Sequence, residues 1–234
     1  MTLFCGVDLA WKDTNKSGVT LLEDTANKPK IHFVDTVLTD KQILGYAKKA
    51  SIISIDAPLI LPEKDKDRKA EQAIQKEYTK KGVGIYPANK AWLKKIGGGR
   101  IRGQDLLKNL KQQGYTQRPE KHNSVIEVYP AAIHVELFNL EKPLPYKYKK
   151  GRTKKQCHIS LLQLQRYINT RIEANIDIVP KETSQTTLKE LKKAEDKLDS
   201  VLCAYTAYLH SQQKTQIYGN IPTGYIVTPR LKET

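Results

Sequence analysis

Short apolar runs and longer stretches of helical periodicity divide the chain into recognisable elements. Runs rich in β-branched residues predict strands at residues 3–7, 17–22, 30–38, 51–56 and 124–129, with short terminal strands at 216–218 and 225–228. Helical spacing predicts helices at residues 39–50, 66–81, 104–113, 131–140, 156–174 and 188–209. The glycine-punctuated stretch 82–103 is interpreted as a connection.

This order of three strands followed by alternating helices and strands is that of an RNase H-like fold, an α/β mixed sheet with helices on both faces. In such a sheet the first and fourth strands are central neighbours. The 234 residues fit one domain over 1–234, with insertions at about 60–122 and 141–185, and the chain shows no internal repeat.

Acidic residues recur where apolar runs end. Asp8 ends the first strand, Asp56 ends the fourth before Ala57-Pro58, and Glu127 lies in the apolar run that closes at Pro130. A structural turn acid is the alternative for each. On the last predicted helix, Asp199 flanks the apolar stripe formed by Leu191, Leu198, Leu202 and Tyr205. That stripe is expected to face the sheet, which would turn Asp196 nearly away from it and leave Asp196 and Glu195 as weaker alternatives.

Carboxylates that converge on one sheet edge need a cation. Two unit charges about 4 Å apart repel by roughly 4 kcal/mol at an effective dielectric constant near 20. Oxygen ligands without a Cys or His pattern suit Mg²⁺ or Mn²⁺. Two such ions activate a water and stabilise the leaving oxygen of a phosphodiester. Asp8, Asp56, Glu127 and Asp199 are therefore predicted as catalytic metal ligands.

The excess of positive charge favours a polyanionic partner. Lys and Arg outnumber Asp and Glu by 40 to 25, and the isoelectric point is about 9.6. One basic run interleaved with Tyr146 and Tyr148 has the composition of a phosphate-tracking loop, and a solvated flexible loop is an equal alternative. The predicted nucleic-acid-binding residues are Arg100, Arg102, Lys147, Lys149, Lys150, Arg152, Lys154 and Lys155. DNA and RNA both remain open.

Cysteine content and hydropathy indicate where in the cell the protein is expected. Three scattered cysteines do not form a disulfide framework or a cysteine-rich metal site. No stretch approaches eighteen apolar residues, and the N-terminus lacks a basic region followed by an apolar one. We expect a soluble cytoplasmic protein with no membrane partner.

Four motifs in order, "GVDLAW", "SIDAPL", "EVYPAA" and "DKLDSVLCAYTA", resemble those of the domain-of-unknown-function 429 family, whose members are predicted nucleases of RNase H-like fold. The resemblance spans residues 6 to about 229. Glu71 stands where that family's pattern leads us to expect Asp, and Ser200 where it leads us to expect Ala. The resemblance implies a divalent-metal-dependent nuclease.

Two other classes of function compete with a nuclease. A nucleic-acid-binding protein of the same fold would use the acids only structurally, and self-repelling carboxylates near a phosphate backbone would bring it no benefit. An actin-like or sugar-kinase-like phosphotransferase shares the Gly-x-Asp strand, but such folds normally need two domains and a longer chain.

Overall fold

A five-stranded mixed sheet forms the centre of the protein. The computed structural model describes residues 1–62, 68–181 and 186–231. The sheet is built from β1 (Leu3–Asp8), β2 (Ser17–Glu23), β3 (Lys30–Val37), β4 (Ile52–Asp56) and β5 (Ser124–Glu127). Its order is β3-β2-β1-β4-β5, with β2 antiparallel to its neighbours and β1, β4 and β5 parallel. This order confirms the predicted RNase H-like α/β fold.

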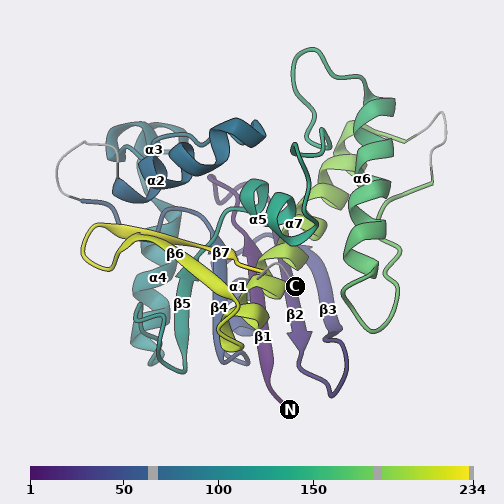
Figure 1. The fold of residues 1–234 in the computed structure, drawn as a ribbon. Coiled ribbons are helices and arrows are strands. Elements are labelled where there is room, and N and C mark those ends of the chain that lie inside the picture. Colours follow the sequence, from purple (N-terminus) through teal and green to yellow (C-terminus); the bar gives the residue numbers. More distant parts are fainter. Residues whose placement is uncertain (63–67, 182–185, 232–234) are drawn as a thin grey trace.

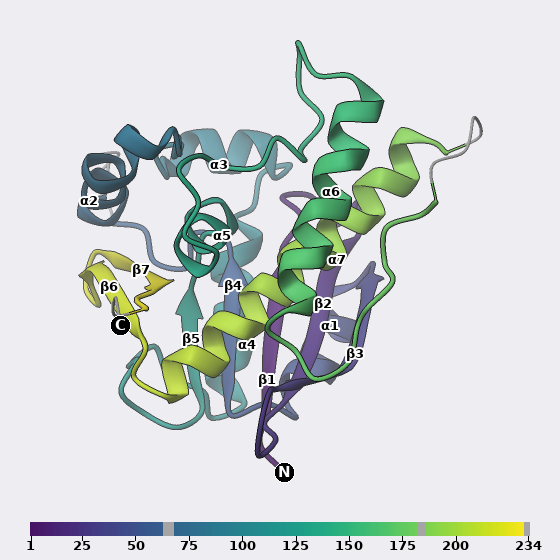
Figure 2. The ribbon, with the colours of Figure 1, turned by 45° about the vertical axis from the view of Figure 1, so that its right-hand side comes forward.

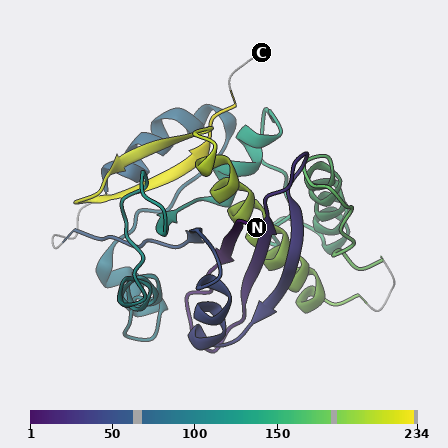
Figure 3. The same ribbon diagram turned by 90° about the horizontal axis from the view of Figure 1, so that it is seen from below.

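Helices cover both faces of this sheet (Figure 1). They are α1 (Asp40–Ala47), α2 (Lys69–Tyr78), the 3₁₀ turn η1 (Thr79–Lys81), α3 (Lys90–Ile96), α4 (Arg102–Gln112), α5 (Pro130–Leu137), α6 (Lys154–Asn169) and α7 (Leu188–Ser211). One core joins the sheet to α5, α6 and α7, and a second joins it to α1 and α4 on the opposite face (Figure 3). Within the described ranges, none of the helices has the length and apolar character needed to cross a bilayer.

Two further parts lie beside the sheet and the helices that cover it. A ribbon of β6 (Thr215–Asn220) and β7 (Gly224–Pro229) packs on α2 and α5. Helices α2 and α3 lie at the end of the sheet where β1, β4 and β5 finish (Figure 2). Helix α4 lies inside the first predicted insertion, yet its leucines Leu106, Leu107 and Leu110 belong to the core under the sheet.

The strand predictions agree with the structure to within two residues, whereas the helices differ more. Those predicted at 39–50 and 131–140 end three residues earlier, at Ala47 and Leu137. The predicted connection contains α3, which the Asn89 side chain caps by accepting from the Trp92 N–H (3.0 Å). Helix α6 ends at Asn169 instead of 174, because the Asn169 side chain bonds the backbone of Ile176 in both directions and turns the chain. Lys66, the predicted start of α2, lies outside the described residues.

Strand alternation decides which side chains meet α7. On β1, Phe4 joins the α7 side of the core, whereas Cys5 and Val7 join the α1 and α4 side. Gly6 faces the α7 backbone. Because successive side chains point to opposite faces, Asp8 shares the face of Phe4 and Gly6.

The side of α7 nearest the sheet carries small residues and not the leucine stripe that was expected there. A Cβ on Gly6 would overlap the backbone of Ser200 and Ala204, and one on Gly18 would overlap the carbonyl of Asp196. The Ser200 and Thr20 hydroxyls are 2.7 Å apart. At 100° per residue, Leu198 and Leu202 point away from this side, toward the core shared with α6. The predicted rotation of α7 is therefore wrong, because the helix is buried on two sides and its largest apolar stripe packs on α6.

Substitution of Gly6 tests this close contact. Gly6→Ala should lower the free energy of unfolding by about 3 kcal/mol, because the added methyl meets helix backbone that cannot rotate away. Gly45→Ala on α1 is the matched control: its Cβ would enter open space, so we expect a gain of about 0.5–1 kcal/mol. Urea unfolding measures both, and equal effects would mean that α7 does not touch β1 this closely.

Candidate functional site

Asp8 and Asp56 stand side by side at the carboxyl ends of neighbouring parallel strands. They are register partners in the β1–β4 pairing, so their side chains share the face covered by α7. Both side chains are partly buried. In residues 1–62, 68–181 and 186–231, neither carboxylate has a hydrogen bond or an ion pair. The prediction that these two acids end adjacent strands is confirmed.

The protonation behaviour of this pair reflects burial among like charges. Burial raises the pKa of Asp8 well above its usual value, and the carboxylates of Asp199 and Asp196 raise it further. Burial likewise raises the pKa of Asp56 to about 7, although Lys147 lowers it in part. Two carboxylates left without a partner in a partly buried site are costly unless a cation joins them.

Asp199 reaches the same place from α7 and is held on both oxygens. The Tyr146 hydroxyl donates to its Oδ1 (2.7 Å), and the Lys147 ammonium lies 2.7 Å from its Oδ2. The Asp199 side chain is fully buried, whereas a third of the Lys147 side chain is exposed. Burial alone would lower the pKa of Lys147, but Asp199, Tyr146, Asp8 and Asp56 together raise it well above its usual value.

Lys147 thus belongs to the acidic cluster and not to a solvated loop. The sequence grouped it with the other cations of the basic run, four of which have other surroundings. Lys149, Lys150 and Lys155 are exposed, and Lys154 donates to the Thr186 carbonyl (2.7 Å). The signal that could have singled out Lys147 is the charge of the acids themselves, since a converging set of carboxylates requires a nearby cation.

Asp196 also lies near the cluster. It is 8% exposed, and its carboxylate pairs with Lys192 (2.8 Å), which also pairs with Glu195 (2.7 Å). The expectation that Asp196 points away from the sheet is wrong, because it sits on the side of α7 that meets Gly18. Among the helix acids, Asp199 raises the pKa of both Asp8 and Asp56, whereas Asp196 is a leading influence only on Asp8.

Glu127 has a different environment from Asp8 and Asp56. It is the register partner of Ile55, so it points to the sheet face opposite Asp56. Its two oxygens accept from Arg68 (2.5 and 2.9 Å), and one also accepts from the Leu59 N–H (2.9 Å). Arg68 is 1% exposed and also pairs with Glu71. These contacts do not support a ligand role for Glu127, and they give Glu71 a structural one.

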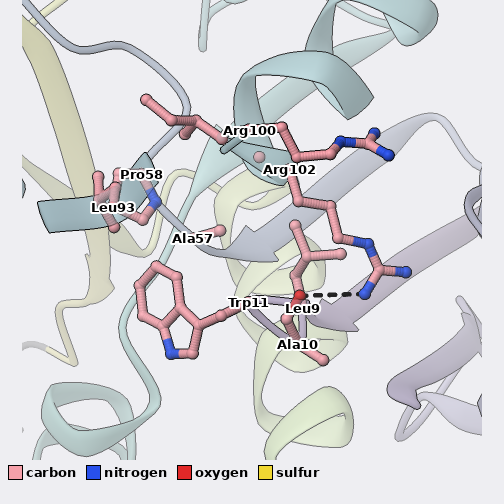
Figure 4. A pocket seen from close by; sticks show the side chains of 10 residues that line it. Leu9, Ala10, Trp11, Ala57, Pro58, Leu93, Arg100 and Arg102 are labelled. Atoms are coloured by element: carbon pink, nitrogen blue, oxygen red, sulfur yellow. Dashed lines mark hydrogen bonds between the residues drawn. The ribbon is translucent and has the colours of Figure 1, made fainter. Parts of the chain in front are cut away.

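Arg102 is buried and bonded within the chain. It is 3% exposed, and its guanidinium donates to Asp40 (2.7 Å) and to the carbonyl of Ala10 (3.0 Å), which holds the loop that follows Asp8 (Figure 4). This burial does not favour its predicted role in nucleic-acid binding. Arg100 is more exposed but is shared among Asp13, Asp40 and Asp105. These arginines stabilise the loops around the site.

The donor set fits a hard divalent cation bound by few protein ligands. Across the described residues, no group of three or more His, Cys, Asp or Glu side chains is arranged to hold one ion. Mg²⁺ is commonly held by one or two carboxylates, with waters and substrate phosphates completing its shell. The two unpartnered carboxylates of Asp8 and Asp56 meet that requirement.

The role of Glu127 can be separated from that of the acid pair. Glu127→Gln should lower the free energy of unfolding by roughly 3 kcal/mol, because it weakens a buried ion pair and leaves Arg68 undercompensated. Glu136→Gln, which breaks the more exposed pair with Lys81, is the control and should cost less than about 1 kcal/mol. Chemical unfolding gives both values. Unchanged stability together with lost Mg²⁺ binding would return Glu127 to the ligand set.

Comparison with known proteins places the chain in a family. No curated protein matches it significantly. The family model described as "Protein of unknown function (DUF429)" matches residues 6–223, which contain all the acids described above. Because this match covers nearly the whole chain, the protein belongs to the DUF429 family.

Proposed function

We propose that the protein is a divalent-metal-dependent nuclease that hydrolyses phosphodiester bonds of nucleic acid. One observation carries this proposal: Asp8 and Asp56 are paired in register, share one face, and have no partner within the described chain. Structural acids are normally paired or capped, as Glu127 is. A pair without compensation is the feature expected of a cation site.

Asp8 and Asp56 would hold Mg²⁺ or Mn²⁺, with Asp199 beside them. When bound, such ions, two in the reaction we favour, polarise the phosphoryl oxygens and supply a hydroxide at neutral pH. The residues of the chain position the site: Tyr146 and Lys147 fix the Asp199 carboxylate. Lys147 also offsets the charge of the acids, which eases the approach of a phosphate.

The surface around the site supports a polyanionic substrate. The net charge is +15, and Lys149 and Lys150 are exposed in the segment that also supplies Lys147. Cations of this kind neutralise phosphates without reading bases. All three cysteines are free thiols, in accord with action in the cytoplasm.

A non-catalytic nucleic-acid-binding protein is the second candidate. The Lys147–Asp199 ion pair favours it, since an internal cation neutralises an acid without any metal. The absence of such a partner for Asp8 and Asp56 in the described residues favours the nuclease. Labelled single-stranded and duplex DNA and RNA, incubated with and without Mg²⁺ or Mn²⁺ beside an Asp8→Asn variant, distinguish the two. Binding without metal-dependent cleavage would establish the second candidate.

Metal binding can be measured without turnover. Mg²⁺ should raise the midpoint of thermal unfolding of the native protein, because it binds only the folded state. At a Mg²⁺ concentration of 100 times the dissociation constant, this binding adds about 2.7 kcal/mol to the free energy of unfolding. Asp8→Asn and Asp56→Asn should abolish this shift, and in EDTA they should be at least as stable as the native protein because a repulsive charge is gone. Asp24→Asn, an exposed acid beyond β2, is the control. An undiminished Mg²⁺ shift in Asp8→Asn would refute the site.

The two acids of α7 should differ in their effect on cleavage. Asp199→Asn should abolish metal-dependent activity, because Asp199 lies close to both Asp8 and Asp56 and anchors Lys147. Asp196→Asn should retain much of it, since Asp196 pairs with Lys192. Single-turnover cleavage rates give the comparison. Equal losses would show that both acids serve the site, and loss in Asp196→Asn alone would reverse the assignment.

A further inference from the structure

Three exposed aromatic side chains gather near the end of the sheet where β1 and β4 finish. Trp11, Tyr86 and Trp92 are 46%, 72% and 40% exposed. The Trp11 and Trp92 rings meet edge to face with centroids 5.9 Å apart, and Tyr86 lies nearly parallel to Trp92 at 6.4 Å. We call these three residues the aromatic cluster. A contiguous exposed aromatic surface of this kind usually marks a binding site.

The aromatic cluster is linked to the proposed catalytic acids by the turns that follow them. Trp11 follows Asp8 in the turn Leu9-Ala10-Trp11, and Ala57-Pro58 follows Asp56. These two turns line one small cavity together with Leu93 of α3, and Figure 4 shows the Trp11 ring beside Ala57, Pro58 and Leu93. The turn after Asp8 therefore carries one of the exposed rings, and the turn after Asp56 packs beside it.

The position of Trp92 is fixed by its neighbours. Leu93 is 2% exposed and packs in a small core with Leu61, Ala88 and Ile101. Asn89 caps α3 through the Trp92 N–H. Because Leu93 points inward, the adjacent Trp92 is held at the surface. Packing in the core therefore does not explain why a large apolar ring stands at this position.

We infer that the aromatic cluster stacks unpaired bases of a single-stranded segment of nucleic acid, next to the phosphate that reaches Asp8 and Asp56. This inference rests on the proposed function. Aromatic rings bind bases of any sequence through their faces, which a duplex hides. Lys12, Lys94 and Lys95 are exposed and lie within three residues of the two tryptophans in sequence, so the rings lie near cations suited to a phosphate backbone.

Intrinsic fluorescence gives a direct test, because Trp11 and Trp92 are the only tryptophans in the sequence. In EDTA, where neither metal nor cleavage contributes, single-stranded oligothymidylate and oligouridylate should quench the emission. A duplex of equal length should quench it at least several-fold less at the same concentration. The two oligomers separate DNA from RNA as the preferred source of the bases.

Side-chain removal should then weaken binding without changing its electrostatics. Trp92→Ala should reduce single-strand affinity about tenfold, measured by fluorescence anisotropy of a labelled oligomer, with an unchanged slope of log affinity against log salt. Trp92→Phe, which keeps a ring, should lose less. Ile217→Ala on β6, which removes an apolar side chain of similar exposure (46%), is the matched control and should bind normally.

The outcomes separate this inference from the nuclease proposal. Single-strand quenching with a Trp92→Ala defect, but no cleavage with any metal, would support the aromatic cluster and refute the nuclease. Metal-dependent cleavage with no quenching, with equal quenching by a duplex, or with Trp92→Ala binding as tightly as Ile217→Ala would overturn the inference and leave the nuclease standing.

Discussion

The close approach of α7 to β1 and β2 is the constraint on which the rest of the structure depends. Gly6 and Gly18 remove two side chains from the sheet, so that the backbone of Asp196, Ser200 and Ala204 can lie against it. The Ser54 hydroxyl adds a hydrogen bond to the Cys203 carbonyl (2.6 Å). This contact brings the acids of α7 to the end of the sheet where β1 and β4 finish.

Charge compensation then divides the buried and partly buried acids into two groups. Glu127 shares Arg68 with Glu71, Glu195 and Asp196 share Lys192, and Asp199 has Lys147. Only Asp8 and Asp56 in this set lack a partner among the described residues. A buried carboxylate is tolerated when a cation or several donors compensate it, so the unpaired acids mark the place where the protein alone does not complete the site.

Segments outside the sheet supply the cation and the aromatic side chains near the acids. The chain between α5 and α6 carries Tyr146 and Lys147 to Asp199, and the chain between β4 and α4 carries α3 and its exposed rings. Arg102 ties the turn after Asp8 to the start of α4. The sheet positions the acids, while the connecting segments provide the cation and the aromatic surface beside them.

Local patterns predicted the strand order and the Asp8–Asp56 pairing, since apolar runs report burial and the first and fourth runs each ended at an acid. They did not predict the face of Glu127, because the direction of a side chain depends on the register of its strand with β4. Nor did the leucine stripe of α7 show which side of the helix faces the sheet. This helix is buried on two sides, and its large residues pack on α6 while its small residues make the close backbone contact with the sheet. The roles of Lys147 and the aromatic cluster could not be predicted from the sequence either. Their partners are distant along the chain, and a charge or ring acquires its role only from the neighbours that folding brings to it.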